Sequence, residues 1–205
     1  MRIIPTVAAL CFLLIPPALA QEKTFNAETF TLPNGMQVVV VPNHRAPVVS
    51  HMVWYRTGAI DEPRGQSGVA HFVEHLMFKG TPAIPPGEFS THVKAMGGDD
   101  NAFTSQDYTA YFESVASARL EDVMKMEADR MTALSFPPDE VLSERKVVME
   151  ERRARTENDP RAYFGEQMKA ALFINHPYGN PVIGWLQELD SLERDNVKRF
   201  YETHY

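Results

Sequence analysis

The chain has 205 residues, of which 44% are hydrophobic, 23% charged and 10% aromatic, a balance typical of a globular protein rather than a disordered or collagen-like one. The formal net charge of -7 argues against a nucleic-acid partner, because nucleic-acid-binding proteins present a basic surface. The length is sufficient for one sizeable hydrophobic core.

Residues 1–20 have the features of a secretory signal peptide. Arg2 precedes an apolar run over residues 7–15, and the small-residue pattern at 18–20 predicts cleavage after Ala20. A membrane anchor would need roughly 20 apolar residues, and prolines 16 and 17 interrupt the run, while no later segment is long enough to span. Cys11 is the only cysteine and leaves with this peptide, so a transition metal would have to be held by histidines and carboxylates.

The first part of the mature chain is rich in β-forming residues. Two β-rich runs in TFNAETFTLPNGMQVVVVP are separated by Pro33-Asn34-Gly35, which predicts a hairpin, and PVVSHMVWYRTGAI predicts a third strand. Glycine-containing residues 65–68 then lead into VAHFVEHLMF. Its apolar residues and good helix formers predict a helix from about Val69 to Phe78, ended by Gly80 and the prolines beyond it.

The remainder is mainly helical. We predict a pair of strands in NAFTSQDYTAYFES, a loop in INHPYGNPVIGW, and helices over about 90–96, 115–134, 139–157, 162–173 and 186–205. Strands and helices are mixed without regular β-α alternation, which favours an α+β fold. We find no linker, and residues 21–205 have the size of one domain.

The motif HFVEH, residues 71–75, points to a metal site. A helical residue advances by about 100°, so Glu74 lies about 60° to one side of His71 and His75 about 40° to the other. Two histidines four residues apart on one helix face can bind the same zinc ion, and HxxEH is the inverzincin order of this motif. On the motif alone, a polar helix face with a hydrogen-bonded core histidine remains the alternative.

The best source of a third ligand is the predicted helix over residues 139–157. Helical geometry puts Glu144 and Glu151 on the same face as valines 141, 147 and 148, whereas Glu150 points away. A carboxylate on an apolar face needs a partner, and a metal with its supporting residues would provide one. The alternative is that these acids reach solvent, or that Glu151 pairs with Arg155 one turn later.

Several sequence blocks occur in the order and spacing of a known family. They are LPNGMQVVVVP, GQSGVAH, HFVEH, EHLMFKGT, GGDDNAFTSQDYTAYF, ERKVVMEE and HPYGNPVIG. With them the chain resembles the N-terminal part of the M16 metallopeptidases, the group that includes pitrilysin, insulin-degrading enzyme and the mitochondrial processing peptidase β-subunit. The resemblance implies a half-domain of the LuxS/MPP-like type, a mainly antiparallel sheet packed with helices.

The resemblance also implies a role for each site residue. His71 and His75 match zinc ligands, Glu74 the general base and Glu151 the third ligand. Glu144 matches a second acidic residue of the same helix, which supports catalysis without ligating the metal. The expected reaction is zinc-dependent hydrolysis of peptide bonds in peptides or small unfolded proteins, with Glu74 taking a proton from the attacking water.

In the family, the stretch Asn101-Ala102-Phe103-Thr104 forms a sheet edge to which the substrate adds as an extra strand, and Asn101, Ala102 and Phe103 are the expected substrate-binding residues. Phe78 and Phe103 would border a side-chain pocket, although as bare sequence each is also a candidate core aromatic. The other histidines match no ligand position and are interpreted as surface or packing residues: His44, His51, His92, His176 and His204.

Two rival functions belong to other classes. A small-molecule lyase such as S-ribosylhomocysteinase also carries an HxxEH helix, but it completes its metal site with a cysteine, which the mature chain lacks. A non-catalytic peptide-binding partner subunit or inactive fragment is the second rival, although such subunits have typically lost the zinc motif. Zinc content together with the effect of Glu74→Gln on peptide cleavage would separate these possibilities.

Family members continue beyond the point that corresponds to Tyr205, into a second and similar half that encloses the substrate chamber. We therefore expect the chain to be a fragment of the catalytic domain, with the C-terminal half or a homologous M16 subunit as its partner. The signal peptide and the resemblance together predict export, to the periplasm of a bacterium.

Overall fold

The computed structural model describes residues 25–205, and the predicted signal peptide with Cys11 lies outside the described residues. Contacts divide the chain into a unit that ends at Ala46 and a larger unit, Pro47–Tyr205. Each unit is described by itself, and a single domain over 21–205 stays a prediction.

The first unit contains an antiparallel hairpin, as the sequence predicts. Strand β1 (Glu28–Thr31) pairs with β2 (Gln37–Val40), and Thr31 lies opposite Gln37. The turn between the strands contains Gly35, whose φ of 89° is in the left-handed region that glycine tolerates best.

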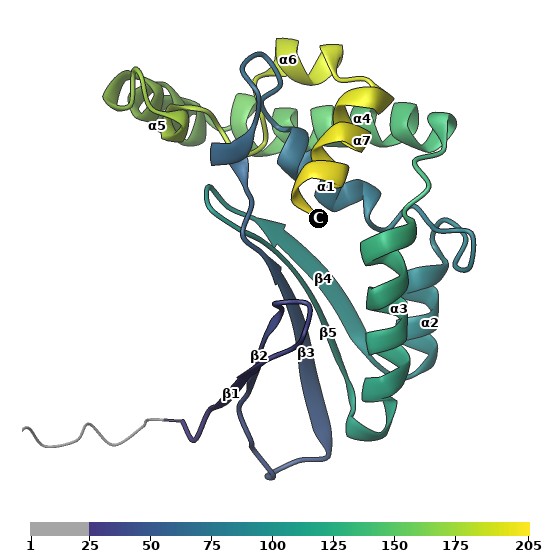
Figure 1. The fold of residues 1–205 in the computed structure, drawn as a ribbon. Coiled ribbons are helices and arrows are strands. Elements are labelled where there is room, and N and C mark those ends of the chain that lie inside the picture. Colours follow the sequence, from purple (N-terminus) through teal and green to yellow (C-terminus); the bar gives the residue numbers. More distant parts are fainter. Residues whose placement is uncertain (1–24) are drawn as a thin grey trace, which may run out of the picture. The chain divides into compact units, whose positions relative to one another are not determined.

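A three-stranded antiparallel sheet is the framework of the second unit (Figure 1). Its order is β3 (Val48–Tyr55), β5 (Thr109–Ala116), β4 (Asp99–Thr104), so that β4 is an edge strand. In the register of β4 and β5, Phe103 lies opposite Ala110 and Thr104 opposite Thr109. Because neighbouring side chains of a strand point to opposite faces, Phe103 and Thr104 face different sides of the sheet.

Seven α-helices accompany this sheet within the described residues: α1 (Val69–Leu76), α2 (Glu88–Ala95), α3 (Leu120–Ala133), α4 (Pro138–Arg152), α5 (Pro160–Leu172), α6 (Leu186–Ser191) and α7 (Arg194–His204). Short 3-10 turns are η1 (Ala59–Asp61), η2 (Ser117–Arg119) and η4 (Pro177–Gly179). The helix predicted from residue 115 begins later, since β5 continues to Ala116. The helix predicted over 186–205 is interrupted at Leu192 and Glu193, which have extended backbone angles.

The predicted helix over 139–157 changes type before it ends. After α4, residues Arg153–Glu157 form a π-helical turn, η3. Arg152, at the junction, turns inward: its guanidinium donates two hydrogen bonds to the Glu166 carboxylate of α5, at 2.8 and 2.9 Å, and one to the Gly184 carbonyl at 2.7 Å. These contacts attach α5 to the helices that carry the candidate site.

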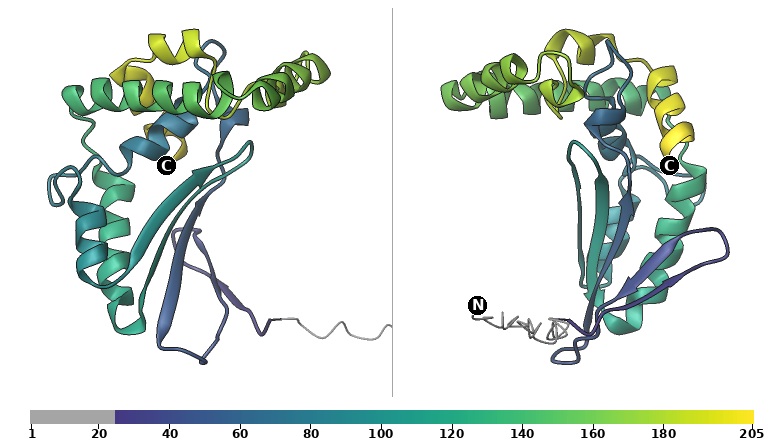
Figure 2. Two further views of the ribbon diagram at one scale, coloured as in Figure 1. Left: turned by 180° about the vertical axis from the view of Figure 1, so that it is seen from behind. Right: turned by 60° about the vertical axis from the view of Figure 1, so that its left-hand side comes forward.

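The buried core is centred on α1. Phe72 and Val73 of this helix pack in one cluster with side chains of β5, α4, α6 and α7, among them Tyr111, Val148 and Val197. Figure 2 shows these helices gathered at one end of the sheet, while α2 and α3 lie side by side along it. A smaller cluster joins α2 and α3 to β5: Phe89, Val93, Val115 and Val123.

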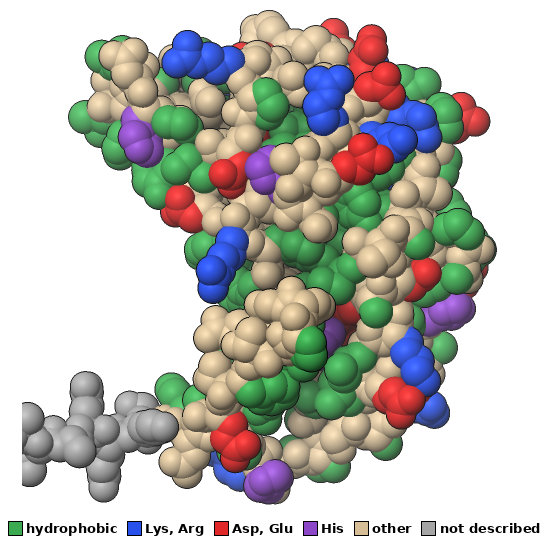
Figure 3. Space-filling model, in the orientation of Figure 1, with side chains coloured by type: hydrophobic (Ala, Val, Ile, Leu, Met, Phe, Trp, Pro, Cys, Tyr) green, Lys and Arg blue, Asp and Glu red, His purple; other side chains and the backbone are tan. Residues whose placement is uncertain are grey.

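The architecture confirms the predicted α+β class, with an antiparallel sheet packed by helices. Charged side chains of both signs are scattered over the helical end of the face shown in Figure 3. Within residues 25–205, every helix is too short or too polar to cross a lipid bilayer.

Candidate metal centre and substrate groove

Helix α1 carries the HFVEH motif, and a carboxylate from the segment before it accepts hydrogen bonds from its first turn. Gly68, with φ of 86°, precedes the helix, and Glu62 accepts hydrogen bonds from the backbone N–H groups of Gly68 and Ala70, both at 3.0 Å. A carboxylate at this position satisfies N–H groups that have no partner in the helix and complements the helix dipole. Burial nevertheless raises the pKa of Glu62 to about 8.

His71, His75 and Glu151 bring their side chains together, and we call these three residues the open cluster. The ligand atoms that they offer all lie within 4.8 Å of one another. Nε2 of His75 is 3.3 Å from Oε2 of Glu151, and Nε2 of His71 is 3.7 Å from the same oxygen. The i, i+4 spacing on α1 and the position of Glu151 on α4 thus converge as the helix periodicity predicts.

The donor set of the open cluster fits a zinc ion. Oε2 of Glu151 is a buried carboxylate oxygen without a hydrogen-bond partner among the described residues, although two imidazole nitrogens face it. A tetrahedral ion about 2.0–2.1 Å from each ligand would separate the ligand atoms by roughly 3.3 Å, close to the distances found here. Two histidines and one carboxylate are also a ligand set that leaves a fourth position open.

The two histidines have different surroundings. Burial, and then the neighbouring His75, lower the pKa of His71 to about 4, so this imidazole is neutral. Burial also acts to lower the pKa of His75, but its hydrogen bond with Glu144 and the approach of Glu151 outweigh that effect and raise the pKa to about 9. In the metal-free chain, His75 is therefore the histidine that holds a proton.

Glu144 supports His75 from behind. Its Oε1 is 2.8 Å from Nδ1 of His75, which orients the imidazole so that Nε2 faces Glu151. Its other oxygen, Oε2, is 2.6 Å from Nζ of Lys79. Burial acts to raise the pKa of Glu144, but these hydrogen bonds from His75 and Lys79 hold it below its ordinary value.

Glu151 has a partner on each side. Arg155 lies one turn further along the chain and approaches Oε1 at 2.7 Å, while Oε2 faces the histidines. The ion pair with Arg155, considered above as an alternative to metal ligation, is thus present together with the convergence on His71 and His75. The approach of His75 is the largest influence on Glu151 and lowers its pKa. Glu150 is exposed and pairs with Arg153.

Glu74 lies between the open cluster and strand β4. Its Oε2 accepts a hydrogen bond of 2.5 Å from the hydroxyl of Thr104, the last residue of β4. The side chain is largely buried, and this burial raises the pKa of Glu74 above the usual carboxyl range. A carboxyl group with a raised pKa is suited to carrying a proton between two reacting groups.

A groove of about 630 Å³ opens along the open cluster and the edge strand. Side chains of α1, β4, α4, η3 and the segment before α6 form its wall: His71, Glu74, His75, Asn101, Ala102, Phe103, Thr104, Val147, Glu151, Arg155, Thr156, Val182 and Ile183. Three of the predicted substrate residues, Asn101, Ala102 and Phe103, therefore line the same groove as the metal ligands. Within this groove the Asn101 side chain accepts a hydrogen bond from the Ala102 N–H at 2.8 Å.

Phe78 does not line this groove. Its ring lies among core side chains, 5.9 Å from the ring of Phe89 and 6.2 Å from that of Tyr111, because the chain beyond α1 turns toward α2. Its position fits the alternative of a core aromatic, and a substrate-binding role for Phe78 stays a prediction without support from the groove geometry. Phe103 instead packs with two exposed aromatic residues, Trp54 of β3 and Tyr108 in the turn before β5.

A second cluster of histidine and carboxylates was not predicted. His51, Glu113 and Glu127, which we call the closed cluster, also offer ligand atoms within 4.8 Å of one another. Here Nδ1 of His51 is 3.0 Å from Glu113, and the buried guanidinium of Arg130 bonds to both carboxylates. Burial raises the pKa of Glu113 to about 7, whereas the ion pair with Arg130 overcomes the effect of burial and lowers the pKa of Glu127.

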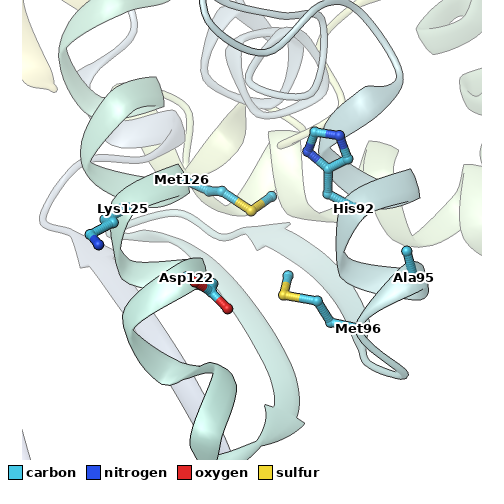
Figure 4. A pocket seen from close by; sticks show the side chains of 6 residues that line it. All are labelled: His92, Ala95, Met96, Asp122, Lys125 and Met126. Carbon is cyan, nitrogen blue, oxygen red and sulfur yellow. The ribbon is translucent and has the colours of Figure 1, made fainter.

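A further hollow of about 420 Å³ lies between α2 and α3. Figure 4 shows the sulfur-bearing ends of Met96 and Met126 directed into it, with His92, Ala95, Asp122 and Lys125 around them. It does not bring together a base, a ligand set and a sheet edge. The groove beside the open cluster is therefore the candidate active site.

Two side-chain contacts within this site were not predicted from the sequence. Thr104 bonds to Glu74, and Lys79 bonds to Glu144. Lys79 lies four residues after His75, just beyond the end of α1, and this spacing could have identified it. The alternation of side chains along a strand predicts which face of the sheet Thr104 occupies. It does not predict which helix residue lies opposite that face.

Comparisons with known proteins assign the chain to a family. The family model described as insulinase (peptidase family M16) matches residues 37–185. The zinc protease PqqE of Helicobacter pylori is 38% identical over 91% of this chain. The chain spans 42% of that relative's length.

Two solved structures have the same fold. A protease from Helicobacter pylori superposes with a TM-score of 0.80 at 38% identity, over 88% of this chain and 44% of that one. The periplasmic protease PqqL from Escherichia coli gives a TM-score of 0.79 at 30% identity, over 86% of this chain and 20% of that one. The fold is thus that of an M16 half-domain, and the relatives that share it include proteins named zinc proteases. The chain belongs to the insulinase family of peptidases, peptidase family M16.

Proposed function

We propose that this chain is the catalytic half of a zinc-dependent endopeptidase. His71, His75 and Glu151 would hold the ion, and Glu74 would act as the general base. The observation that carries the proposal is the convergence of three ligand atoms within 4.8 Å beside a buried carboxylate, in a groove bounded by an open strand edge. The names of the relatives, zinc proteases, support the same chemistry.

Zinc bound there would supply Lewis-acid chemistry, polarising a peptide carbonyl and lowering the pKa of a water molecule to about 7. Glu74 accepts a proton from the attacking water and returns it to the amide nitrogen as the C–N bond breaks. Because Thr104 engages Oε2 of Glu74, the other carboxylate oxygen is the one available for this proton. Glu144 holds the imidazole of His75 in the tautomer that presents Nε2 to the ion.

The edge of β4 is the part of the groove that would receive the peptide. Strand β4 pairs with β5 on one side, and the backbone groups on its other side can pair with an added strand. Such pairing grips the main chain largely independently of sequence, as expected for peptides and small unfolded proteins. Phe103 at this edge would contact a substrate side chain.

We further propose that the working enzyme contains a second half that completes the substrate chamber, because the chain spans 42% and 44% of two relatives. Export to the bacterial periplasm is supported by the N-terminal sequence and by the relation to periplasmic PqqL. A non-catalytic partner subunit is the less favoured function, since the residues that would form the ligand set and the base lie together in the groove.

The proposal is tested by zinc content and peptide cleavage together. The chain should bind one zinc ion, keep it in Glu74→Gln and lose it in His71→Ala and Glu151→Ala. Cleavage of a fluorogenic peptide would be measured with the chain fused to the C-terminal half of the Helicobacter pylori relative. We expect Glu74→Gln to reduce kcat by about 10²–10⁴-fold. Absence of zinc binding, or full cleavage by Glu74→Gln, would overturn the proposal.

A further inference from the structure

We propose that Thr104 is a positioning residue for the general base. This inference rests on the proposed function, because it concerns how Glu74 is held while it accepts a proton. The hydroxyl of Thr104 donates to Oε2 of Glu74 at 2.5 Å, and among residues 25–205 this is the hydrogen bond that reaches the Glu74 side chain. Thr104 comes from β4 and Glu74 from α1, so the bond joins the sheet to the helix.

The direction of this hydrogen bond follows from the surroundings of Thr104. A threonine hydroxyl donates a single proton. The nearby hydroxyl of Thr109 is 3.5 Å from that of Thr104 and has a closer acceptor in the Thr57 carbonyl, at 3.0 Å. The carboxylate of Glu74 is therefore the acceptor for the Thr104 proton. With Oε2 fixed in this way, rotation of the carboxyl group about its bond to the side chain is restrained.

Strand geometry explains why Thr104 can do this while its neighbours serve the substrate. Ala102 and Thr104 share the face of β4 that is directed to the helices, and Ala102 packs against the core cluster of α1. Phe103 points to the opposite face, where it packs with Trp54. One short strand thus provides a hydrogen-bonding edge for a peptide, an aromatic side chain and an anchor for the base.

This arrangement fixes the position of Glu74 relative to a bound peptide. A peptide that adds to the edge of β4 is placed relative to the backbone of β4, and Glu74 is tied to the last residue of the same strand. Misplacement of a reacting group by about 1 Å can reduce a rate by about 100-fold. Loss of the Thr104 hydroxyl should therefore affect the chemical step more than zinc or peptide binding.

The test compares Thr104→Val, which keeps the shape of the side chain and removes the hydroxyl, with Thr104→Ser, which keeps the hydroxyl. Thr132→Val is the matched control, because Thr132 is exposed on α3 and its hydroxyl bonds to the Ala128 carbonyl of its own helix. Each variant is measured in the full chain for zinc affinity, and in the fused enzyme for kcat and KM. Crystal structures of the zinc-loaded variants locate the Glu74 carboxylate.

We expect Thr104→Val to lower kcat by about 10- to 100-fold with KM and the zinc dissociation constant changed less than about twofold. Its Glu74 carboxylate should leave the position seen here, whereas Thr104→Ser should keep that position and stay within about threefold of the unmodified kcat. Thr132→Val should change neither. Should Thr104→Val be poorly folded, Thr104→Ala provides the same loss of hydroxyl and the same expectation.

Two outcomes would overturn the inference while leaving the proposed function intact: an unchanged kcat and Glu74 position in Thr104→Val, or an equal loss in Thr104→Ser. Loss of zinc from Thr104→Val would also overturn it, because a structural role would then account for the defect. Failure of the proposed function looks different, since cleavage would survive Glu74→Gln or zinc would not bind to the unmodified chain.

Discussion

The open cluster and the closed cluster contain the same kinds of side chain and differ in what neutralises them. The open cluster offers two histidine nitrogens and one carboxylate oxygen, whereas the closed cluster offers one histidine nitrogen and two carboxylate oxygens. In each cluster these ligand atoms lie within 4.8 Å of one another. In the closed cluster the guanidinium of Arg130 already bonds to Glu113 and Glu127, and it lies 4.1 Å from the ring centre of Phe89. In the open cluster a groove gives access, and Oε2 of Glu151 has no hydrogen-bond partner among the described residues.

The difference shows that ligand spacing alone does not define a metal site. A buried carboxylate must be neutralised by a cation, a proton or a metal ion. Arg130 fulfils this need permanently from within the fold, and a protein cation that is always charged cannot be displaced easily. Around Glu151, Arg155 engages one oxygen only and is exposed, so the other oxygen remains available to a metal.

Removal of Arg130, the cation inside the closed cluster, should have the largest effect of the substitutions considered, and it should act on the free energy of unfolding. Arg130→Met would leave two buried carboxylates without their partner and should destabilise the chain by about 3–5 kcal/mol, measured by urea unfolding. The matched control is Arg119→Met, since Arg119 forms an exposed ion pair with Asp122 and should change the free energy of unfolding by less than about 1 kcal/mol. Equal effects of the two substitutions would contradict the distinction between the clusters.

The affinity for zinc should depend on pH, and the pKa of His75 should set the slope of that dependence. Zinc requires neutral imidazoles, and the pKa values of about 9 for His75 and about 4 for His71 mean that one proton must leave between these limits. Affinity should therefore fall as pH decreases, about tenfold per unit, or about 100-fold from pH 8 to pH 6.

Competition with a chromophoric chelator at each pH would measure this slope. If both histidines had ordinary pKa values near 6.5, affinity would be almost constant above pH 7. A constant affinity between pH 7 and pH 8 would thus contradict the pKa assigned to His75.

Removing the ammonium group that bonds to Glu144, the partner of His75, should have a smaller effect on zinc affinity. Lys79→Met removes the ammonium group that bonds to Glu144 and should weaken zinc binding by about tenfold, the lower end of the range for such outer partners, because Lys79 is partly exposed. Lys146→Met, an exposed position on the same helix as Glu144, is the control. Calorimetric titration with zinc would compare the two, and equal affinities would remove Lys79 from the site.

Substitution of His51 should have the smallest effect on zinc binding. His51→Gln alters the closed cluster while leaving the open cluster intact, so zinc stoichiometry should stay at one per chain and the dissociation constant should change by less than about twofold. Metal analysis after dialysis would measure both quantities. A reduced stoichiometry would mean that the closed cluster binds zinc as well.

Local periodicity is what made the open cluster predictable. His71, Glu74 and His75 share a helix face at fixed spacing, and Glu144 and Glu151 do so on α4. The same periodicity misplaced Val147, which was expected on the buried face but is 47% exposed, because the groove opens at this position. Which helix face meets which strand is decided by packing over the whole chain.

Contacts that depend on packing were therefore not predicted. His51 and Glu113 are 62 positions apart on two strands, and Arg130 comes from a third element, so no spacing rule connects them. The bond between Thr104 and Glu74 spans 30 positions between a strand and a helix. The π-helical turn after α4 was read as continuous helix, since its residues have no composition that would separate them from α4.

That turn sets the spacing between Glu151 and the residues that follow it. A π-helical turn contains more residues than an α-helical one, so each of its residues adds less rotation than the roughly 100° of an α-helical residue. Deleting Ala154 would move Arg155 from the fourth to the third position after Glu151 and bring Thr156 to the fourth, while the amino acids of the metal site remain the same. A crystal structure of the deletion variant would detect this change, and a π-helical turn that persists after the deletion would disprove it. The electrostatic environment of the ligand thus depends on chain length as well as on residue type, so a single-codon deletion could retune the site without replacing any of its ligands.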